Sequence, residues 1–245
     1  MRTAILLFLP TLLAAQQNFE FTGRYWIPHM NTRIRVESAG LGSDIDARTD
    51  LGIRDANFPE AAFTWQHGRS LVAFSYTPID YSASQDVNRT IIFRGRQYTI
   101  GTHVDSDLKL HYLHLAWAYQ FVRIRDGIVR FGPMIGADGF LMHGSLAAPS
   151  FNISEREDVS IGLPIVGLAL DIQPRRWLGI YGQVYGMDIG DYGNFIGSDS
   201  GVKVEPVKHL LLTVGYRTFH LHVDDSPDFA RLHIRGPFVG AGLRW

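Results

Sequence analysis

The strongest constraint on the fold is an alternation of apolar and polar residues that recurs along most of the chain. In one long segment, Leu113, Leu115, Trp117 and Tyr119 occupy every second position. Successive side chains of a β-strand point to opposite faces, so this period predicts strands with one apolar face. We expect about ten strands, with eight or twelve as alternatives, near residues 19–27, 61–66, 72–77, 105–121, 129–138, 159–173, 177–189, 199–205, 210–217 and 229–245.

The connections between these segments alternate between short and long. The short ones cover residues 66–69, 123–127, 174–176 and 206–208. The long ones cover residues 37–60, 81–104, 143–158, 190–198 and 224–228. This order predicts an all-β, antiparallel up-and-down barrel with tight turns at one end and larger loops at the other. Residues 32–36, 44–53 and 90–100 are expected either to extend strands or to add a hairpin.

The residues opposite the apolar face decide whether such a barrel lies in water or in a membrane. They are mainly Gly, Ala, Thr and Gln with isolated charges, and only 19% of the whole chain is charged. A solvated surface carries charge at about a quarter to a third of its positions. The pattern therefore favours a transmembrane barrel whose Leu, Val, Phe and Tyr side chains face lipid. A soluble secreted ligand-binding barrel is the alternative.

The N-terminus has the pattern of a secretory signal peptide. A positive start, Met1 to Thr3, precedes an apolar run over 4–13 that is too short to span a bilayer. We expect cleavage near Ala15, which gives a signal peptide over 1–15 and a barrel domain over 16–245. The expected location is the bacterial outer membrane.

Composition excludes several other classes of protein. There are 23 basic and 24 acidic residues, so no positive excess is available to bind nucleic acid. Cysteine is absent, which excludes disulfides and thiolate chemistry. No phosphate-binding, dinucleotide-binding or zinc-protease motif occurs. We therefore expect no cofactor and no metal.

The C-terminal strand carries a second signal. Val239, Ala241, Leu243 and Trp245 alternate with smaller or polar residues up to the final aromatic. This resembles the last strand of Gram-negative outer-membrane β-barrel proteins. The resemblance implies that these four residues are an assembly signal for the barrel-assembly machinery, although such strands end more often on Phe.

The first half of the chain also resembles a group of small outer-membrane barrels that has no established chemistry. The similar segments are Asp50 to Ile53 before Pro59, Ile92 to Gly95, and residues 101–106 leading into Tyr112. This resemblance supports the fold and leaves the function open.

Seven charged residues lie on the polar faces of the expected strands. Inside a narrow barrel such charges must pair or stay hydrated, which predicts an ionic plug or, alternatively, a constricted pore. These predicted interior residues are Glu20, Arg24, Arg130, Asp138, Asp171, Arg217 and Arg244.

One motif suggests an alternative enzymatic role. His143, Ser145 and Glu157 resemble the catalytic residues of outer-membrane lipid A deacylases, which implies a serine esterase acting on lipid. The Asn expected after Ser145 is missing, the chain is longer, and the remainder does not align. We favour a protein that is not an enzyme.

Two other groups are weaker candidates, as calcium and metal sites respectively. Asp44, Asp46 and Asp50, with Asp105 and Asp107, place carboxylates in the outer loops, and the sequence favours a solvated acidic loop. His220 and His222 share one face of a strand, and we interpret them as a polar rim.

The register of one strand changes along its length. Leu108 and Leu110 are out of phase with Leu113 and the residues after it, so a bulge near His111 and Tyr112 is expected.

These observations predict a monomeric outer-membrane barrel with a structural or small passive-pore role. Its expected partners are outer-membrane lipid and the barrel-assembly machinery.

Overall fold

The computed structural model describes residues 17–35, 42–93, 96–125, 127–149, 153–188, 190–225 and 228–245, and the expected signal peptide lies outside these ranges. The described strands are β1 (Gln17–Trp26), β2 (His29–Arg35), β3 (Ile45–Asp46), β4 (Phe58–His67), β5 (Ser70–Asp86), β6 (Ile91–Phe93), β7 (Arg96–Tyr98), β8 (His103–Tyr119), β9 (Val122–Ile124), β10 (Val129–Ala148), β11 (Ile153–Arg175), β12 (Leu178–Asp188), β13 (Gly193–Val207), β14 (Leu210–Asp225) and β15 (Asp228–Arg244). A short 3-10 turn covers Gly190–Tyr192. Within the described residues, no helix is long and apolar enough to cross a membrane.

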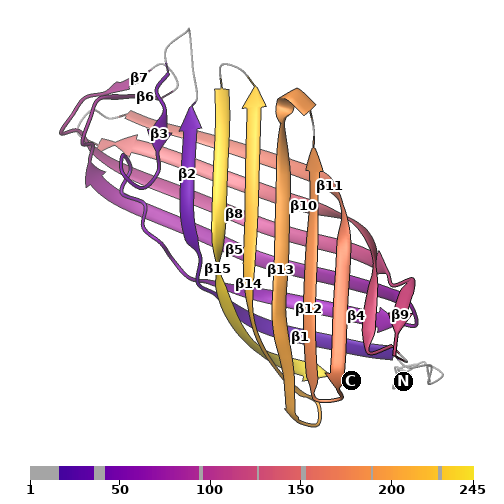
Figure 1. Cartoon of the computed structure of the whole chain (residues 1–245). Helices are drawn as coiled ribbons and strands as arrows, with labels where there is room; N and C mark the ends of the chain where they lie inside the picture. Colours follow the sequence, from indigo (N-terminus) through magenta and orange to yellow (C-terminus); the bar gives the residue numbers. More distant parts are fainter. Residues whose placement is uncertain are drawn as a thin grey trace, which may run out of the picture.

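The long strands form a closed antiparallel barrel of ten strands, which confirms the predicted fold class (Figure 1). β1 pairs with β4 on one side and with β15 on the other, and this closes the sheet. β2 continues β1 after Ile27 and Pro28 and stays paired with β15. Both β1 and the end of β15 lie at one end of the barrel, which we call the lower end.

The strand expected at 199–205 is longer than its sequence indicated. β13 runs from Gly193 to Val207, and its inner face has Gly197 and Gly201 where rings from β12 lie against it. A Cβ atom at Gly197 would lie 2.5 Å from the Tyr185 ring. The apolar alternation that marks other strands is therefore weak here.

The outside of the barrel carries a belt of exposed apolar side chains, which is the reverse of a soluble barrel. Phe21 is 51% exposed, Leu115 51%, Val166 67% and Val214 54%. Further members of this belt are Tyr25, Ile27, Phe74, Trp117, Ile135, Leu168, Val184, Ile196, Tyr216 and Val239. The predicted assignment of apolar faces to the outside is correct.

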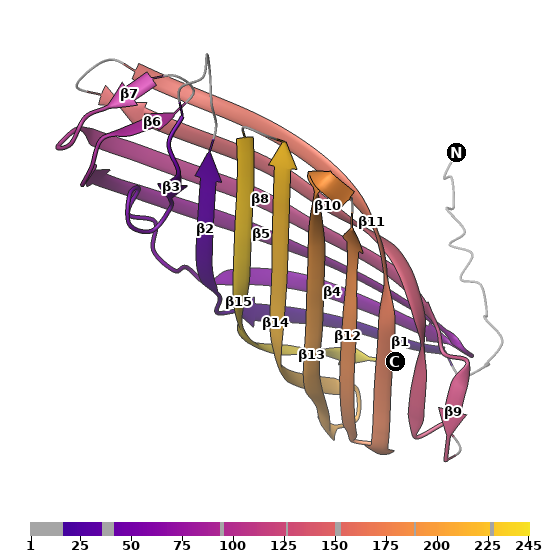
Figure 2. The same ribbon diagram turned by 45° about the horizontal axis from the view of Figure 1, so that its top comes forward.

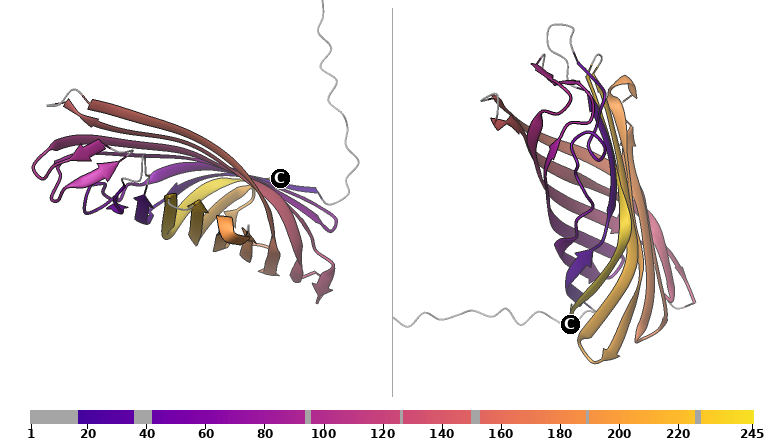
Figure 3. Two further views of the ribbon diagram at one scale, coloured as in Figure 1. Left: turned by 90° about the horizontal axis from the view of Figure 1, so that it is seen from above. Right: turned by 90° about the vertical axis from the view of Figure 1, so that its left-hand side faces the viewer.

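Above the belt the barrel separates into two walls (Figures 1 and 2). The first wall contains the upper parts of β5, β8, β10 and β11, and the second contains β12 to β15 with β2. Pairing of β11 with β12 begins at Val166, and pairing of β4 with β5 ends at Tyr76, so the walls diverge at these two seams. The views from above and from the side show this divergence (Figure 3).

The interior between the walls is apolar, and this corrects the predicted bulge near His111 and Tyr112. Pairing of β8 with β5 and β10 continues through both residues without a shift. Leu110 simply points inward, at 1% exposed, into a core that includes Ile79 and Ile165. The apolar face changes from outside to inside because the upper barrel extends beyond the exposed apolar belt and encloses its own core.

The segment over residues 42–57 and the β6–β7 hairpin cover the seam between β2 and β5. Ser43 and Ile92 exchange hydrogen bonds of 3.0 and 2.8 Å, the second to the Ser43 hydroxyl. Arg89 Nε donates to Asp50 Oδ1 at 2.9 Å, and this bond raises the pKa of Arg89. The described parts of segments 32–36, 44–53 and 90–100 thus add strands and a hairpin at the end of the barrel opposite the lower end, as expected. We call residues 42–57 and β6–β7 the cap.

Candidate functional site: the charged barrel interior

The lower end of the lumen is a charged vestibule of about 280 Å³. Glu20, from β1, accepts hydrogen bonds from Lys203 and from Arg244, the latter at 2.6 Å. Glu205 binds Arg244 at 3.1 Å, and Arg130 pairs with Asp171 across β10 and β11. Each acid therefore has a basic partner, and the vestibule is held by paired charges that water still reaches.

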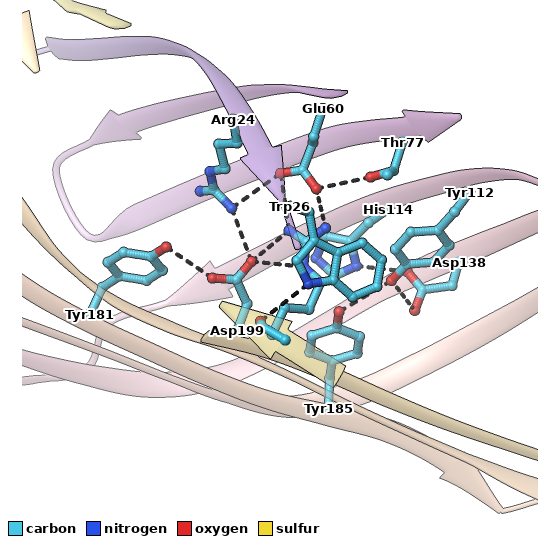
Figure 4. A network of polar contacts seen from close by, with 12 residues as sticks. Arg24, Trp26, Glu60, Thr77, Tyr112, His114, Asp138, Tyr181, Tyr185 and Asp199 are labelled. Atoms are coloured by element: carbon cyan, nitrogen blue, oxygen red, sulfur yellow. Dashed lines mark hydrogen bonds and ion pairs between the residues drawn. The ribbon is translucent and has the colours of Figure 1, made fainter. Parts of the chain in front are cut away.

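A second, deeper group joins opposite sides of the barrel (Figure 4). Arg217 on β14 binds Asp199 Oδ2 at 2.6 Å and Glu60 Oε1 at 3.1 Å. Arg24 on β1 reaches the same two acids, at 3.0 Å for Asp199 and 3.2 Å for Glu60. We call these four residues the ion lattice.

Two hydroxyl groups complete the ion lattice. Thr77 donates to Glu60 at 2.8 Å, and Tyr181 donates to Asp199 at 2.9 Å. Two positive and two negative side chains give the ion lattice no net charge. Their side chains are at most 10% exposed, so full pairing is what makes the burial of four charges tolerable.

Immediately beyond the ion lattice lies a buried polar pair. His114 Nδ1 is 2.6 Å from Asp138 Oδ1, and Tyr112 donates to the other Asp138 oxygen at 3.2 Å. The Tyr112 and Tyr185 hydroxyls are 3.2 Å apart. This group satisfies the Asp138 carboxylate, which is fully buried.

An aromatic layer fills the lumen next to these groups. Phe140 contacts Tyr112, Phe195 and Phe219 with ring centroids 5.1, 5.5 and 6.2 Å apart. Trp26 packs on Phe219 at 5.9 Å and donates its indole N–H to the Gly236 carbonyl. Each of these rings is at most 1% exposed, so side chains occupy the middle of the barrel.

Comparison with known proteins identifies the fold. No protein-family model and no curated protein matches the sequence. Among solved structures, the outer membrane protease OmpT from Escherichia coli matches with a TM-score of 0.53 and 12% identity, covering 96% of this chain and 99% of that one. Ail of Yersinia pestis matches with a TM-score of 0.39 and 10% identity over 94% and 99% of the two chains. The Neisserial surface protein NspA matches with a TM-score of 0.35 and 14% identity over 92% and 95%.

The chain has the fold of the bacterial outer-membrane β-barrel proteins. This fold supports a location in the bacterial outer membrane. In such a barrel the exposed apolar belt is the surface that meets lipid hydrocarbon.

All seven predicted interior residues of this outer-membrane barrel lie in its lumen, but at different levels. Arg24 and Arg217 belong to the ion lattice, and Asp138 binds His114. The other four predicted interior residues line the vestibule: Glu20, Arg130, Asp171 and Arg244.

Sequence reasoning missed the partners of these residues. Glu60 could have been found from the sequence. It precedes Ala62, Thr64 and Gln66 on the polar face of β4, and this alternation indicates that its side chain also points inward. Asp199 lies in the strand that was expected to be short. Lys203 follows it on the same face.

Two of the esterase residues, His143 and Ser145, lie on the outer surface of the first wall and have separate partners. His143 Nδ1 contacts Asp158, whereas the Ser145 hydroxyl donates to Asp107 at 3.5 Å. Glu157 is opposite Gly144 in the backbone register of β10 and β11. This arrangement does not pair His143 with Ser145.

The C-terminal residues of the predicted assembly signal face outward from β15. Val239 is 51% exposed, Leu243 46% and Trp245 55%. Ala241 is opposite Gly23 of β1, and Trp245 exchanges two backbone hydrogen bonds with Phe19. These residues form the closing seam of the barrel, and their recognition by the assembly machinery stays a prediction.

Asp105 and Asp107, which were predicted in an outer loop, lie in β8, whereas Asp44 and Asp50 have basic partners. Asp44 binds Arg35, and Asp50 binds Arg89. Within the described residues, no group of three or more His, Asp or Glu side chains is placed to hold a metal ion.

Proposed function

We propose that this protein is a closed, structural outer-membrane barrel that holds its two walls and cap on the outer side of the membrane without conducting ions. The observation that carries the proposal is the burial of the ion lattice, whose four charged side chains are at most 10% exposed. A conducting path needs water, or polar groups that replace it around the ion, at every level. A fully paired and desolvated group of charges instead connects the strands that carry it.

The layers above the ion lattice support the same function. Phe140, Phe195 and Phe219 are at most 1% exposed, and the apolar core between the walls continues upward from them. Ions entering the vestibule would have to cross apolar side chains with no polar partner to replace water. The cap and the outer rims of the walls are the surface that such a barrel offers for contacts outside the cell.

Conductance in planar lipid bilayers tests this proposal against the passive pore. We expect the wild-type protein to give no steady channel steps, and Arg130→Gln and Arg217→Gln to leave it silent. Insertion is verified on the same reconstituted sample by its resistance to denaturation before boiling. Steady wild-type conductance whose ion selectivity changes in Arg217→Gln would contradict the proposal and favour the pore.

A further inference from the structure

The outer face of the second wall carries a basic surface directly above the apolar belt. Arg235 of β15 is opposite His29 of β2 on one side and Thr218 of β14 on the other. One step higher, His233 is opposite His220, with ring centroids 5.4 Å apart. Directly opposite residues of neighbouring strands lie side by side, so these side chains form one continuous patch.

A groove of about 370 Å³ joins this patch to the belt where β1 gives way to β2. Its lower part is apolar, from Ile27, Tyr216 and Pro237. Its upper part is polar, from His29, Asn57 and Arg235. The groove thus changes from apolar to polar in the direction in which a lipid changes from acyl chain to headgroup.

The charge balance of the groove leaves one cation unmatched. Asp55 lines the groove, lies 2.8 Å from His29 Nδ1 and accepts the Met30 N–H at 3.2 Å. Arg48 Nη2 lies 3.5 Å from Asp55 and supplies the compensating positive charge. Among the described residues, no carboxylate pairs with Arg235, which is exposed.

Asp55 itself is ionised. Partial burial raises the pKa of Asp55, but the hydrogen bonds from His29 and Met30 outweigh it and hold the pKa below its ordinary value. The negative charge of Asp55 therefore repels an anion in the groove. Removal of this charge by substitution should not weaken the binding of an anionic lipid.

The outer face of the first wall is not basic at the same height. Its outward residues above the belt include Asp80, Asp107 and Asp158, and Lys109 is opposite Asp80. An anionic partner is thus attracted to one side of the barrel only.

We propose that this groove binds a phosphate-bearing lipid of the outer leaflet, with the phosphate on Arg235 and an acyl chain along Ile27, Tyr216 and Pro237. A guanidinium suits phosphate because it donates parallel hydrogen bonds with full charge. The apolar residues below extend the lipid-facing belt into the groove. This site is independent of whether the lumen conducts.

Lipid binding to the delipidated protein tests the proposal, with diphosphorylated lipid A added to the micelles and bound lipid counted by native mass spectrometry. We expect Arg235→Gln to weaken binding at least about tenfold, because one charge-assisted contact is lost. Lys109→Gln on the first wall is the matched control and should bind as the wild type does. Asp55→Asn should bind at least as tightly as the wild type.

Several results would overturn the proposal. These are unchanged binding by Arg235→Gln, weaker binding by Asp55→Asn, equal binding of a lipid without phosphate, or full displacement of lipid by inorganic phosphate. The last result would assign the groove to a free anion. Arg235 faces outward and has no ion-pair partner among the described residues, so we expect its variant to fold, and an unchanged heat shift on a gel verifies this.

Discussion

Arg217 shows what a single residue contributes to this barrel. Its guanidinium binds Asp199 through two nitrogens and Glu60 through two, and its side chain is 5% exposed. Arg217→Ala leaves two buried carboxylates with Arg24 alone. We expect the free energy of unfolding, measured by urea titration in micelles, to fall by about 3–5 kcal/mol. Arg217→Lys should give an intermediate loss because an ammonium cannot reproduce the forked contacts.

The matched control at this scale is Arg130→Ala. Arg130 pairs with Asp171 in the vestibule, where the two side chains are 16% and 23% exposed. Because water can replace the lost partner of Asp171, we expect Arg130→Ala to lower the free energy of unfolding by about 1 kcal/mol or less. Equal losses for the two alanine variants would contradict the distinction between the buried ion lattice and the hydrated vestibule.

The residues of the lumen were only partly predictable from the sequence. Arg24, Asp138 and Arg217 stand out because a charge interrupts a small-residue face. Their pairing was not predictable, since Glu60 and Arg217 are 157 positions apart and meet only through barrel closure and strand register. A single sequence carries the alternation within strands but not the register between distant ones.

At the scale of one strand, Gly236 in β15 tests how tightly the wall is built. A Cβ atom there would lie 2.1 Å from the Ile27 carbonyl oxygen, at the break between β1 and β2. Backbone has to move to admit it, so Gly236→Ala should lower the free energy of unfolding by about 1–3 kcal/mol. Gly162→Ala in β11 is the control, because its Cβ meets nothing within 4 Å. A Gly236→Ala variant as stable as this control would show that the seam is looser than described.

Strands were predictable where one face meets lipid and the other meets the lumen. The assumption that the apolar face always points outward led to the wrong prediction of a bulge in β8. Leu110 lies above the belt, where the apolar face points inward. The prediction also underestimated β13, whose inner face has glycine at 197 and 201, where the rings of Tyr185 and Tyr181 lie. Alternation reports which environment each face meets, and that environment changes along a single strand.

The whole molecule combines a lipid-facing belt, a filled lumen and an ordered outer extension. The belt includes Trp117, 42% exposed, whereas the core of the extension includes Ile79 and Val104, each 0% exposed. One chain thus has an outward apolar surface at one height and an inward one at the next. The barrel is stable only if lipid or detergent covers the belt.

The most direct test of this account is the fractionation of cells that express the full chain, followed by gel electrophoresis with and without boiling. We expect recovery in the outer membrane and a mobility shift between unboiled and boiled samples, because the closed sheet resists detergent until it is heated. Recovery in the soluble periplasm with no shift would contradict the account. The exposed apolar belt would then have to lie against protein instead of lipid.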